Sequence, residues 1–210
     1  MARHSNTEER RTQIATALIK VMAERGYDGA AISDIAQAAR LTPGLVHYHF
    51  SNKQEILLVT LRNIVAEHDA KLAERLQQAG ADPVAEVAAF IDFHLSLGSD
   101  ANPEMLACWI LISGEALRQP EVQIEYERAI AGTVKCLERI IRRGVDQGVF
   151  RCKAIDAAAS ALTAAIQGYF VLGAAARSTV PRGSAATSAK QMAHGLLDPV
   201  RPIAKQRGRR

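Results

Sequence analysis

The sequence is poor in aromatic residues and in cysteine, and it lacks the alternating pattern of β-strands. Aromatic residues make up 5% of its 210 residues, and its three cysteines include no C-x-x-C pair. An odd number of widely spaced cysteines excludes a disulfide scaffold and is typical of reduced thiols in a cytosolic protein. Polar and apolar residues nowhere alternate over the length of a strand, while alanine is abundant. We therefore expect an all-α fold with a substantial core.

The sequence also lacks the short motifs of common enzymes and of membrane targeting. It has no H-E-x-x-H, no nucleophile elbow and no phosphate-binding glycine loop, so we expect neither an enzyme nor a bound cofactor. The N-terminus is polar and has no apolar signal-peptide core. Residues 154–176 are long enough to span a bilayer, but they are mainly alanine, which contributes little insertion energy. The sequence thus predicts a cytoplasmic protein without a membrane partner.

Positive charge is concentrated at the two ends of the chain. Residues 1–53 hold seven Lys or Arg and five Asp or Glu, residues 54–200 hold 14 and 17, and residues 201–210 hold five and none. Basic ends on a mildly acidic body suit a protein that binds phosphates locally and keeps its body away from nucleic acid. For the tail itself, a solvated end is the simpler interpretation, and non-specific DNA contact is the alternative.

Apolar residues recur with helical spacing along most of the chain, and glycine, proline and capping residues divide it into segments. Two of the expected helices, 83–97 and 105–112, are apolar on nearly every side, so they belong in the middle of a domain. The predicted helices span 8–25, 32–39, 43–49, 53–79, 83–97, 105–112, 121–143, 155–176 and 185–197.

The helices predicted at 32–39 and 43–49 are short and are joined by a turn of three residues. This is the helix-turn-helix arrangement, in which the second helix enters the major groove of DNA. Ile35 and Val46 can join the two helices, and Gly44 would let the backbone approach DNA closely. Pairs of short helices are common, so the geometry alone does not distinguish a DNA-binding protein from other helical proteins.

Three segments near the N-terminus make the interpretation more specific: Gly26-Tyr27, Ile32-Ser33-Asp34-Ile35-Ala36 and Leu41-Thr42-Pro43-Gly44-Leu45-Val46-His47-Tyr48-His49-Phe50-Ser51-Asn52-Lys53. In order and spacing they resemble the DNA-binding domain of the tetracycline-repressor (TetR) family, over residues 8–60. The Thr-Pro-Gly-x-x-x-x-His-Phe-x-x-Lys form is most similar to the betaine/choline-pathway repressors. The resemblance implies a repressor that binds a palindromic, double-stranded operator and is released by a small-molecule effector. The alternative is a helical small-molecule-binding or interaction protein without specific DNA binding.

The resemblance also implies roles for individual residues. Residues 43–45 would begin the recognition helix near base edges, Tyr48 and His49 would face base edges or phosphates, and Lys53 would bind a phosphate. The implied DNA-binding residues are Ser33, Arg40, Thr42, Pro43, Gly44, Leu45, His47, Tyr48, His49 and Lys53.

Three positions depart from the family pattern. Ala31 stands where a hydroxyl residue is usual, so the helix after it would lack its N-cap. Arg40 stands where glycine is common, which would cost about 1 kcal/mol if the position needs a positive φ, although Arg40 could add a phosphate contact. His47 replaces a usual tyrosine. His47 and His49 do not share a helix face, so we expect no metal site.

Most of the other aromatic residues lie in the middle of the chain, where the resemblance implies an effector site. Aromatic residues at helical spacing are more often core than pocket, and the sequence leaves both open. Trp109 is the only tryptophan, and with an acid such as Glu115 it would suit a quaternary ammonium. A solvated Glu115 is the alternative. The candidate effector-binding residues are Phe90, Phe93, Trp109, Glu115 and Tyr169.

Useful operator specificity needs two helix-turn-helix units related by two-fold symmetry, so we expect a homodimer. Helix 155–176 is rich in small residues, and with helix 185–197 and their symmetry mates it would form a four-helix bundle. Burial of this helix inside a monomer is the alternative. The predicted interface residues are Ala158, Ala161, Leu162, Ala165, Ile166 and Tyr169. The predicted domains are 1–52 (DNA-binding), 53–198 (ligand-binding and dimerisation) and 199–210 (basic tail).

Overall fold

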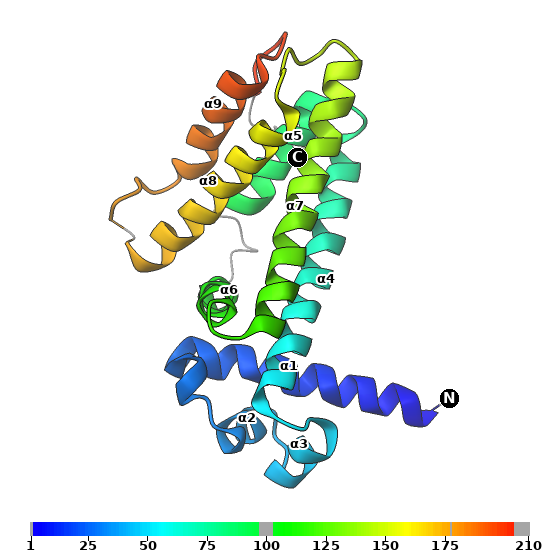
Figure 1. Cartoon of the computed structure of the whole chain (residues 1–210), viewed down its shortest axis with the longest axis vertical. Coiled ribbons are helices and arrows are strands. Elements are labelled where there is room, and N and C mark those ends of the chain that lie inside the picture. Colours follow the sequence, from blue (N-terminus) through cyan, green and yellow to red (C-terminus); the bar gives the residue numbers. More distant parts are fainter. Residues whose placement is uncertain (1, 97–102, 177, 204–210) are drawn as a thin grey trace, which may run out of the picture. The chain divides into compact units, whose positions relative to one another are not determined.

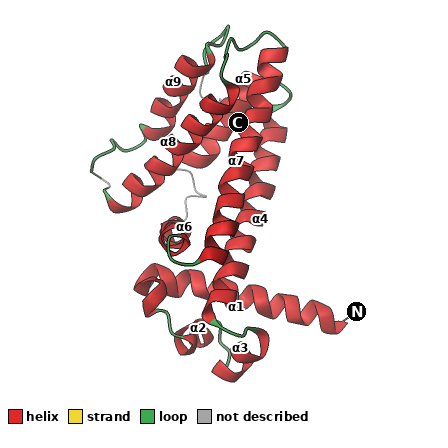
Figure 2. Ribbon diagram, in the orientation of Figure 1, coloured by secondary structure: helices red, strands yellow, loops and turns green. Residues whose placement is uncertain are grey.

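The computed structural model of the chain describes residues 2–96, 103–176 and 178–203, with side chains from residue 7 onward. These residues form helices and no strand (Figure 2), apart from one isolated antiparallel bridge between Phe150 and Pro199. The expected all-α fold is confirmed. The helices are α1 (Ala2–Gly29), α2 (Ile32–Ala38), α3 (Pro43–His49), α4 (Lys53–Ala79), α5 (Pro83–Leu95), α6 (Pro103–Ala116), α7 (Pro120–Asp146), α8 (Ile155–Ala175) and α9 (Ala185–Leu197) (Figure 1).

Local capping chemistry explains several of the helix ends. The Thr42 hydroxyl accepts the Leu45 N–H at 3.2 Å, and the Asp82 carboxylate accepts the Val84 N–H at 3.2 Å. Each cap precedes a proline at the first helical position, where the missing N–H costs no hydrogen bond. Gly26 has φ +71° and interrupts α1 where the first helix was expected to end.

The chain divides into two compact units. Unit 1 consists of residues 1–68 and 102–129, and unit 2 consists of residues 69–101 and 130–210. Unit 1 therefore holds α1 to α3, the start of α4, all of α6 and the start of α7. These limits differ from the predicted boundary after residue 52.

The core of unit 1 forms around α1. This helix contacts α2, α3 and α6, and α2 and α3 lie on the same side of it in Figure 1. Fully buried side chains from α1 meet buried side chains from each neighbour. They include Ile14, Leu18 and Met22 of α1, Ile35 of α2, Val46 of α3, and Cys108 and Ile112 of α6. The two short helices are thus packed against α1 through a shared core.

The core of unit 2 forms between α5, α8 and α9, which contact one another. Helices α8 and α9 lie side by side (Figure 1). Helix α5 is buried along most of its length, as its apolar composition predicts. Among the described residues, α8 is the one helix long and apolar enough to cross a membrane, a property that it shares with core helices.

Candidate DNA-binding and effector sites

Backbone hydrogen bonds hold the turn between α2 and α3. The Leu41 N–H donates to the Ala36 carbonyl at 2.8 Å, and the Arg40 N–H donates to the Gln37 carbonyl at 3.0 Å. This pair of hydrogen bonds closes the end of a helix when the residue after the helix C-cap adopts a left-handed conformation. That residue is usually glycine. Arg40 has φ +56°, so the backbone strain predicted for a non-glycine residue is present here.

The start of α2 has one of the two side-chain hydrogen bonds of a capping box, the one from Asp34, and lacks the one from the N-cap residue. Ala31 is extended (φ −77°, ψ 154°) and offers no side-chain acceptor, as its departure from the family pattern predicts. The Asp34 carboxylate accepts the Ala31 N–H at 3.4 Å and the guanidinium of Arg25 at 2.8 Å. The helix end is therefore stabilised by an acidic residue in its first turn rather than by a hydroxyl cap.

Arg11 of α1 anchors the far end of α3. Its guanidinium donates to the His49 carbonyl and, at 2.8 Å, to the Glu55 carboxylate, and it lies 4.2 Å from the centroid of the Phe50 ring. The Ser51 N–H also donates to Glu55, and these two bonds lower the pKa of that carboxyl. No local motif marks Arg11, and the sequence analysis did not identify it.

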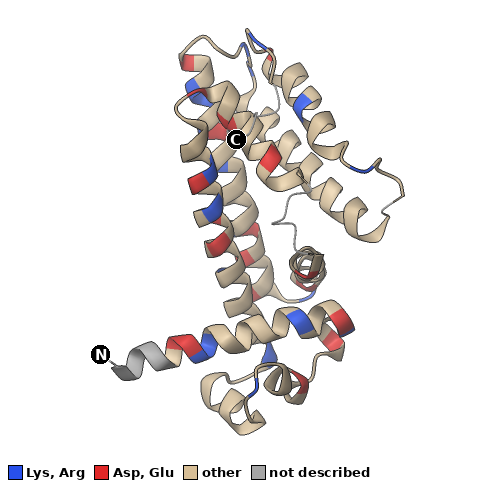
Figure 3. Cartoon of the chain, turned by 180° about the vertical axis from the view of Figure 1, so that it is seen from behind, with Lys and Arg blue, Asp and Glu red and all other residues tan. Residues whose placement is uncertain are grey.

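The outer face of α3 is accessible and holds no Lys, Arg, Asp or Glu. Val46 is fully buried, whereas Tyr48 is 76% exposed. A Cβ at Gly44 would meet no atom within 4 Å, so packing within the fold does not require glycine at this position. The helix has no Lys or Arg (Figure 3). Nearby positive charge comes from residues such as Arg40 in the turn and Lys53 at the start of α4.

Lys53 connects the start of α4 to the end of α1. Its ammonium donates to the Tyr27 carbonyl at 2.7 Å and to the Asp28 carbonyl at 3.4 Å, and it lies 4.3 Å from the centroid of the Tyr27 ring. An ammonium carries three donors, so one remains for a phosphate. The contact with α1 was not foreseen from the sequence.

The ten residues expected to contact DNA all belong to unit 1. Seven of them are exposed, and Leu45, His49 and Lys53 are half-buried. They lie on α2, the turn, α3 and the first residue of α4. This surface can offer hydroxyl, imidazole, guanidinium and ammonium groups to phosphates and a tyrosine to base edges.

Trp109 and Glu115 are the predicted effector residues that lie in unit 1, and they contact different side chains. The ring of Trp109 stacks on that of Tyr126, with centroids 4.9 Å apart and planes tilted by 36°. Glu115 is 6% exposed and accepts a hydrogen bond from the Gln119 side chain at 2.7 Å. Glu115 is therefore not on a solvated face.

The other predicted effector residues belong to unit 2. Phe90 is fully buried in the core, while Phe93 and Tyr169 are half-buried against it. The His94 ring lies 4.5 Å from that of Phe90 and 5.2 Å from that of Phe93 (centroid to centroid). The predicted set is thus divided between the two compact units.

The predicted dimer residues lie on two different faces of α8, which requires a correction. Ala158, Leu162 and Ile166 are buried in the core of unit 2, so they are not available to a second copy. Ala161 is exposed, and Ala165 and Tyr169 are half-buried. The exposed stripe of α8 includes Ala157, Ser160, Ala161, Ala164, Gly168, Val171 and Leu172.

The cysteines offer no reactive thiol or disulfide, and the described residues offer no metal site. All three cysteines are free, and burial raises the pKa of the Cys108 thiol to about 12, which keeps it protonated and unreactive. Within the described part of the chain, no three His, Cys, Asp or Glu residues lie close enough together to hold a metal ion.

Comparison with known families agrees with this geometry. Residues 14–65 match the profile of the bacterial regulatory proteins of the tetR family. Residues 83–198 match the profile of the C-terminal part of BetI-type transcriptional repressors. The chain belongs to the TetR family. The first match covers α2 and α3, and the second covers helices α5 to α9 of this TetR-family chain.

Individual relatives place the TetR-family chain near BetI. It is 32% identical over 117 residues to the HTH-type transcriptional regulator BetI of Rhizobium meliloti (strain 1021), covering 54% of this chain and 55% of that protein. The match therefore spans about half the length of that relative.

Solved structures share the fold. A regulator from Saccharomonospora viridis in complex with choline aligns with TM-score 0.75 and 26% identity, over 90% of this chain and 95% of that one. A TetR regulator from Haloarcula marismortui ATCC 43049 aligns with TM-score 0.79 and 19% identity, over 90% and 99%. The predicted arrangement, an N-terminal helix-turn-helix followed by a larger helical part, is confirmed.

Proposed function

We propose that this TetR-family chain is a cytoplasmic transcriptional repressor that binds a palindromic operator as a homodimer. The observation that carries the proposal is the outer face of α3, where Tyr48 is 76% exposed and Gly44 has open space above it. Glycine inside a helix costs about 0.5–1 kcal/mol relative to alanine. Since nothing inside the fold requires Gly44, close approach of another molecule to this backbone explains its presence.

Two-fold pairing is supported by the apolar surface of unit 2. The exposed stripe of α8 is continuous along one helix face because its members recur every three or four residues. On the neighbouring α9, Met192 and Leu196 are 44% and 42% exposed. Small and apolar side chains on two adjacent helices suit a self-complementary four-helix interface.

A small cationic effector is the second part of the proposal. The BetI-type C-terminal match and the choline-bound structural relative support a quaternary ammonium ligand. The stacked rings of Trp109 and Tyr126 offer aromatic faces of the kind that attract such a cation. By linkage, an effector that lowers operator affinity must itself bind more weakly to the operator complex.

Selection of duplexes from a random DNA pool tests the DNA-binding proposal. The wild-type chain is expected to enrich one palindromic sequence whose half-sites lie a helical repeat or more apart. Enrichment of no common sequence would show instead a helical binding protein without specific DNA recognition.

Titration with choline, followed through the single tryptophan, tests the effector proposal. Choline is expected to change the fluorescence of Trp109 and to release the selected operator. Tyr126→Ala should weaken choline binding by several-fold, in line with about 0.5–2 kcal/mol for one cation–π contact. Phe93→Ala changes one of the three predicted effector residues in unit 2, the others being Phe90 and Tyr169. Its choline affinity tests whether those residues also contribute to choline binding. No fluorescence change and no release would rule out this effector class.

A further inference from the structure

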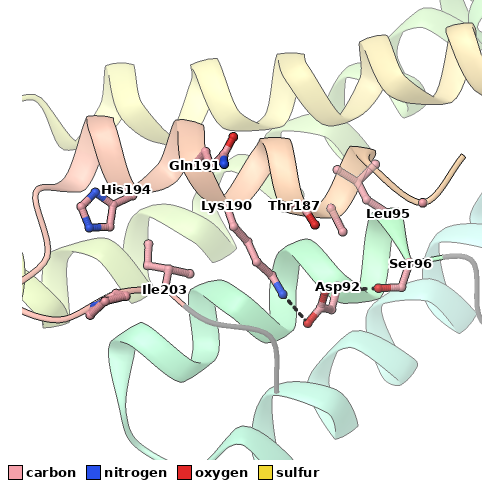
Figure 4. A pocket seen from close by; sticks show the side chains of 11 residues that line it. Asp92, Leu95, Ser96, Thr187, Lys190, Gln191, His194 and Ile203 are labelled. Atoms are coloured by element: carbon pink, nitrogen blue, oxygen red, sulfur yellow. Dashed lines mark hydrogen bonds and ion pairs between the residues drawn. The ribbon is translucent and has the colours of Figure 1, made fainter. Parts of the chain in front are cut away.

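A cavity lies in unit 2, between α5, α9 and residues 202–203. It has a volume of about 600 Å³, within the range of small-molecule sites. Figure 4 shows Lys190 of α9 extending toward Asp92 of α5 inside it. None of its lining residues is among the individual residues named above as contacts to DNA, the effector or a second copy, although five of them lie on α9. Its polar lining residues are Asp92, Ser96, Thr187, Lys190, Gln191 and His194.

Lys190 is an unusual residue for this position. Its side chain is 8% exposed, and its ammonium pairs with the Asp92 carboxylate at 2.7 Å. An ammonium carries three N–H donors, whereas the described residues give Lys190 this single acceptor. A buried charged donor is costly unless its hydrogen bonds are made. A negatively charged group in the cavity would complete them.

The neighbouring side chains favour the same kind of ligand. Thr187, Gln191 and His194 recur every three or four residues with Lys190, so they share a face of α9. In the described part of the chain, these three side chains have no hydrogen-bond partner, and each can donate. Asp92 already accepts from Lys190 and from the Ser96 hydroxyl at 3.2 Å. These three exposed side chains can therefore add donors to the charged donor of Lys190, although each can also accept.

The walls of the cavity add an apolar contribution. Leu95, Pro202 and Ile203 line it beside the polar groups. The exposed residues of α9 assigned to the dimer surface, Met192 and Leu196, do not line it. A ligand here would therefore leave that surface uncovered.

We propose that this cavity binds a small molecule that carries one carboxylate on an apolar body. The carboxylate accepts charge-assisted hydrogen bonds from Lys190, the polar face of α9 supplies further donors, and the apolar body lies against Leu95 and Ile203. The ion pair with Asp92 holds the ammonium in place and leaves the empty site neutral. This site is separate from the proposed cationic effector site at Trp109, which lies in unit 1.

Calorimetric titration of the full chain with octanoate tests the ligand class. Octanoate is expected to bind with a Kd below about 1 mM. Octan-1-ol and octylammonium have the same chain without the negative charge, and both should bind at least about tenfold more weakly. Binding of octan-1-ol as tight as that of octanoate, or no octanoate binding, would overturn the proposal.

Variants locate the binding. Lys190→Met alone would leave Asp92 buried without its partner, so the main variant is Asp92→Leu/Lys190→Met, which replaces the pair by apolar residues of similar size. Helical circular dichroism and cooperative melting would show that this double variant folds. It should lose octanoate affinity at least about tenfold. Lys153→Met removes an exposed lysine before α8 and should bind octanoate as the wild type does. A folded double variant that keeps wild-type affinity would contradict the assignment, whatever the chain does with DNA.

Discussion

Single residues of the turn between α2 and α3 carry a cost that the rest of unit 1 must offset. Arg40 occupies a left-handed conformation, φ +56°, at the position after a helix end that commonly holds glycine. The cost for a residue with a Cβ is about 1–2 kcal/mol. Its guanidinium is exposed in the turn that leads to the recognition helix, where a phosphate contact would explain why arginine is present.

We therefore expect Arg40→Gly to raise the free energy of unfolding by about 0.5–1 kcal/mol, since relief of strain exceeds the extra entropy of glycine in the unfolded chain. Urea denaturation measures this change. Gln37→Gly, at an exposed helical position of α2, should instead destabilise by about 1 kcal/mol. A destabilised Arg40→Gly variant would show that the arginine side chain makes contacts that outweigh the strain.

The contacts around α3 illustrate what single-residue reasoning missed. Arg11 and Glu55 are 44 positions apart, and the Lys53 ammonium reaches carbonyls 25 and 26 positions away. No pattern in a short window of sequence marks such pairs, because they depend on where α1 crosses the other helices. The family resemblance predicted a phosphate-binding role for Lys53 but not its contact with Tyr27.

At the scale of helices, the missing cap of α2 is open to a direct test. Ala31 has the extended conformation of an N-cap but no side-chain acceptor. We expect Ala31→Ser to raise the free energy of unfolding by about 0.5–2 kcal/mol, because the hydroxyl can accept a free N–H of the first turn. Thermal unfolding followed by circular dichroism measures it. Ala38→Ser, in the last turn of the same helix, should give no gain, and a gain as large as that of Ala31→Ser would contradict capping.

Helix ends were more predictable than helix faces. Thr42-Pro43 and Asp82-Pro83 determine helix starts by local chemistry, so α3 and α5 begin where expected. The faces of α8 could not be assigned in this way, because the helix is apolar or small on every side. Leu162 and Ile166 pack inside unit 2, and the exposed side is the stripe around Ala161 and Ala164. Only tertiary packing distinguishes the two sides.

At the scale of the whole molecule, the proposed dimer predicts that a charge on the exposed stripe separates the subunits. Ala161→Arg changes an exposed residue, so the variant should fold, but it would place an unpaired charge in the interface. Sedimentation velocity should show a wild-type dimer and a monomeric variant with weaker operator binding. Ala131→Arg, at an exposed position of α7, should remain dimeric. A wild-type monomer at micromolar concentration would exclude the dimer.

The operator affinity of Gly44→Leu tests the central claim most directly, because stability and DNA binding should change in opposite directions. A Cβ at this position meets nothing within 4 Å, so replacement of this helical glycine should stabilise the fold by up to about 0.5–1 kcal/mol. The same side chain would hold the backbone of α3 away from DNA, and operator binding measured by fluorescence anisotropy should weaken by at least about 1–3 kcal/mol. Tyr48→Ala should weaken binding by a similar amount, whereas Leu117→Ala, at a residue that is 89% exposed outside the helix-turn-helix, should not. Wild-type operator affinity in a stabilised Gly44→Leu variant would contradict the assignment of α3 as the recognition helix.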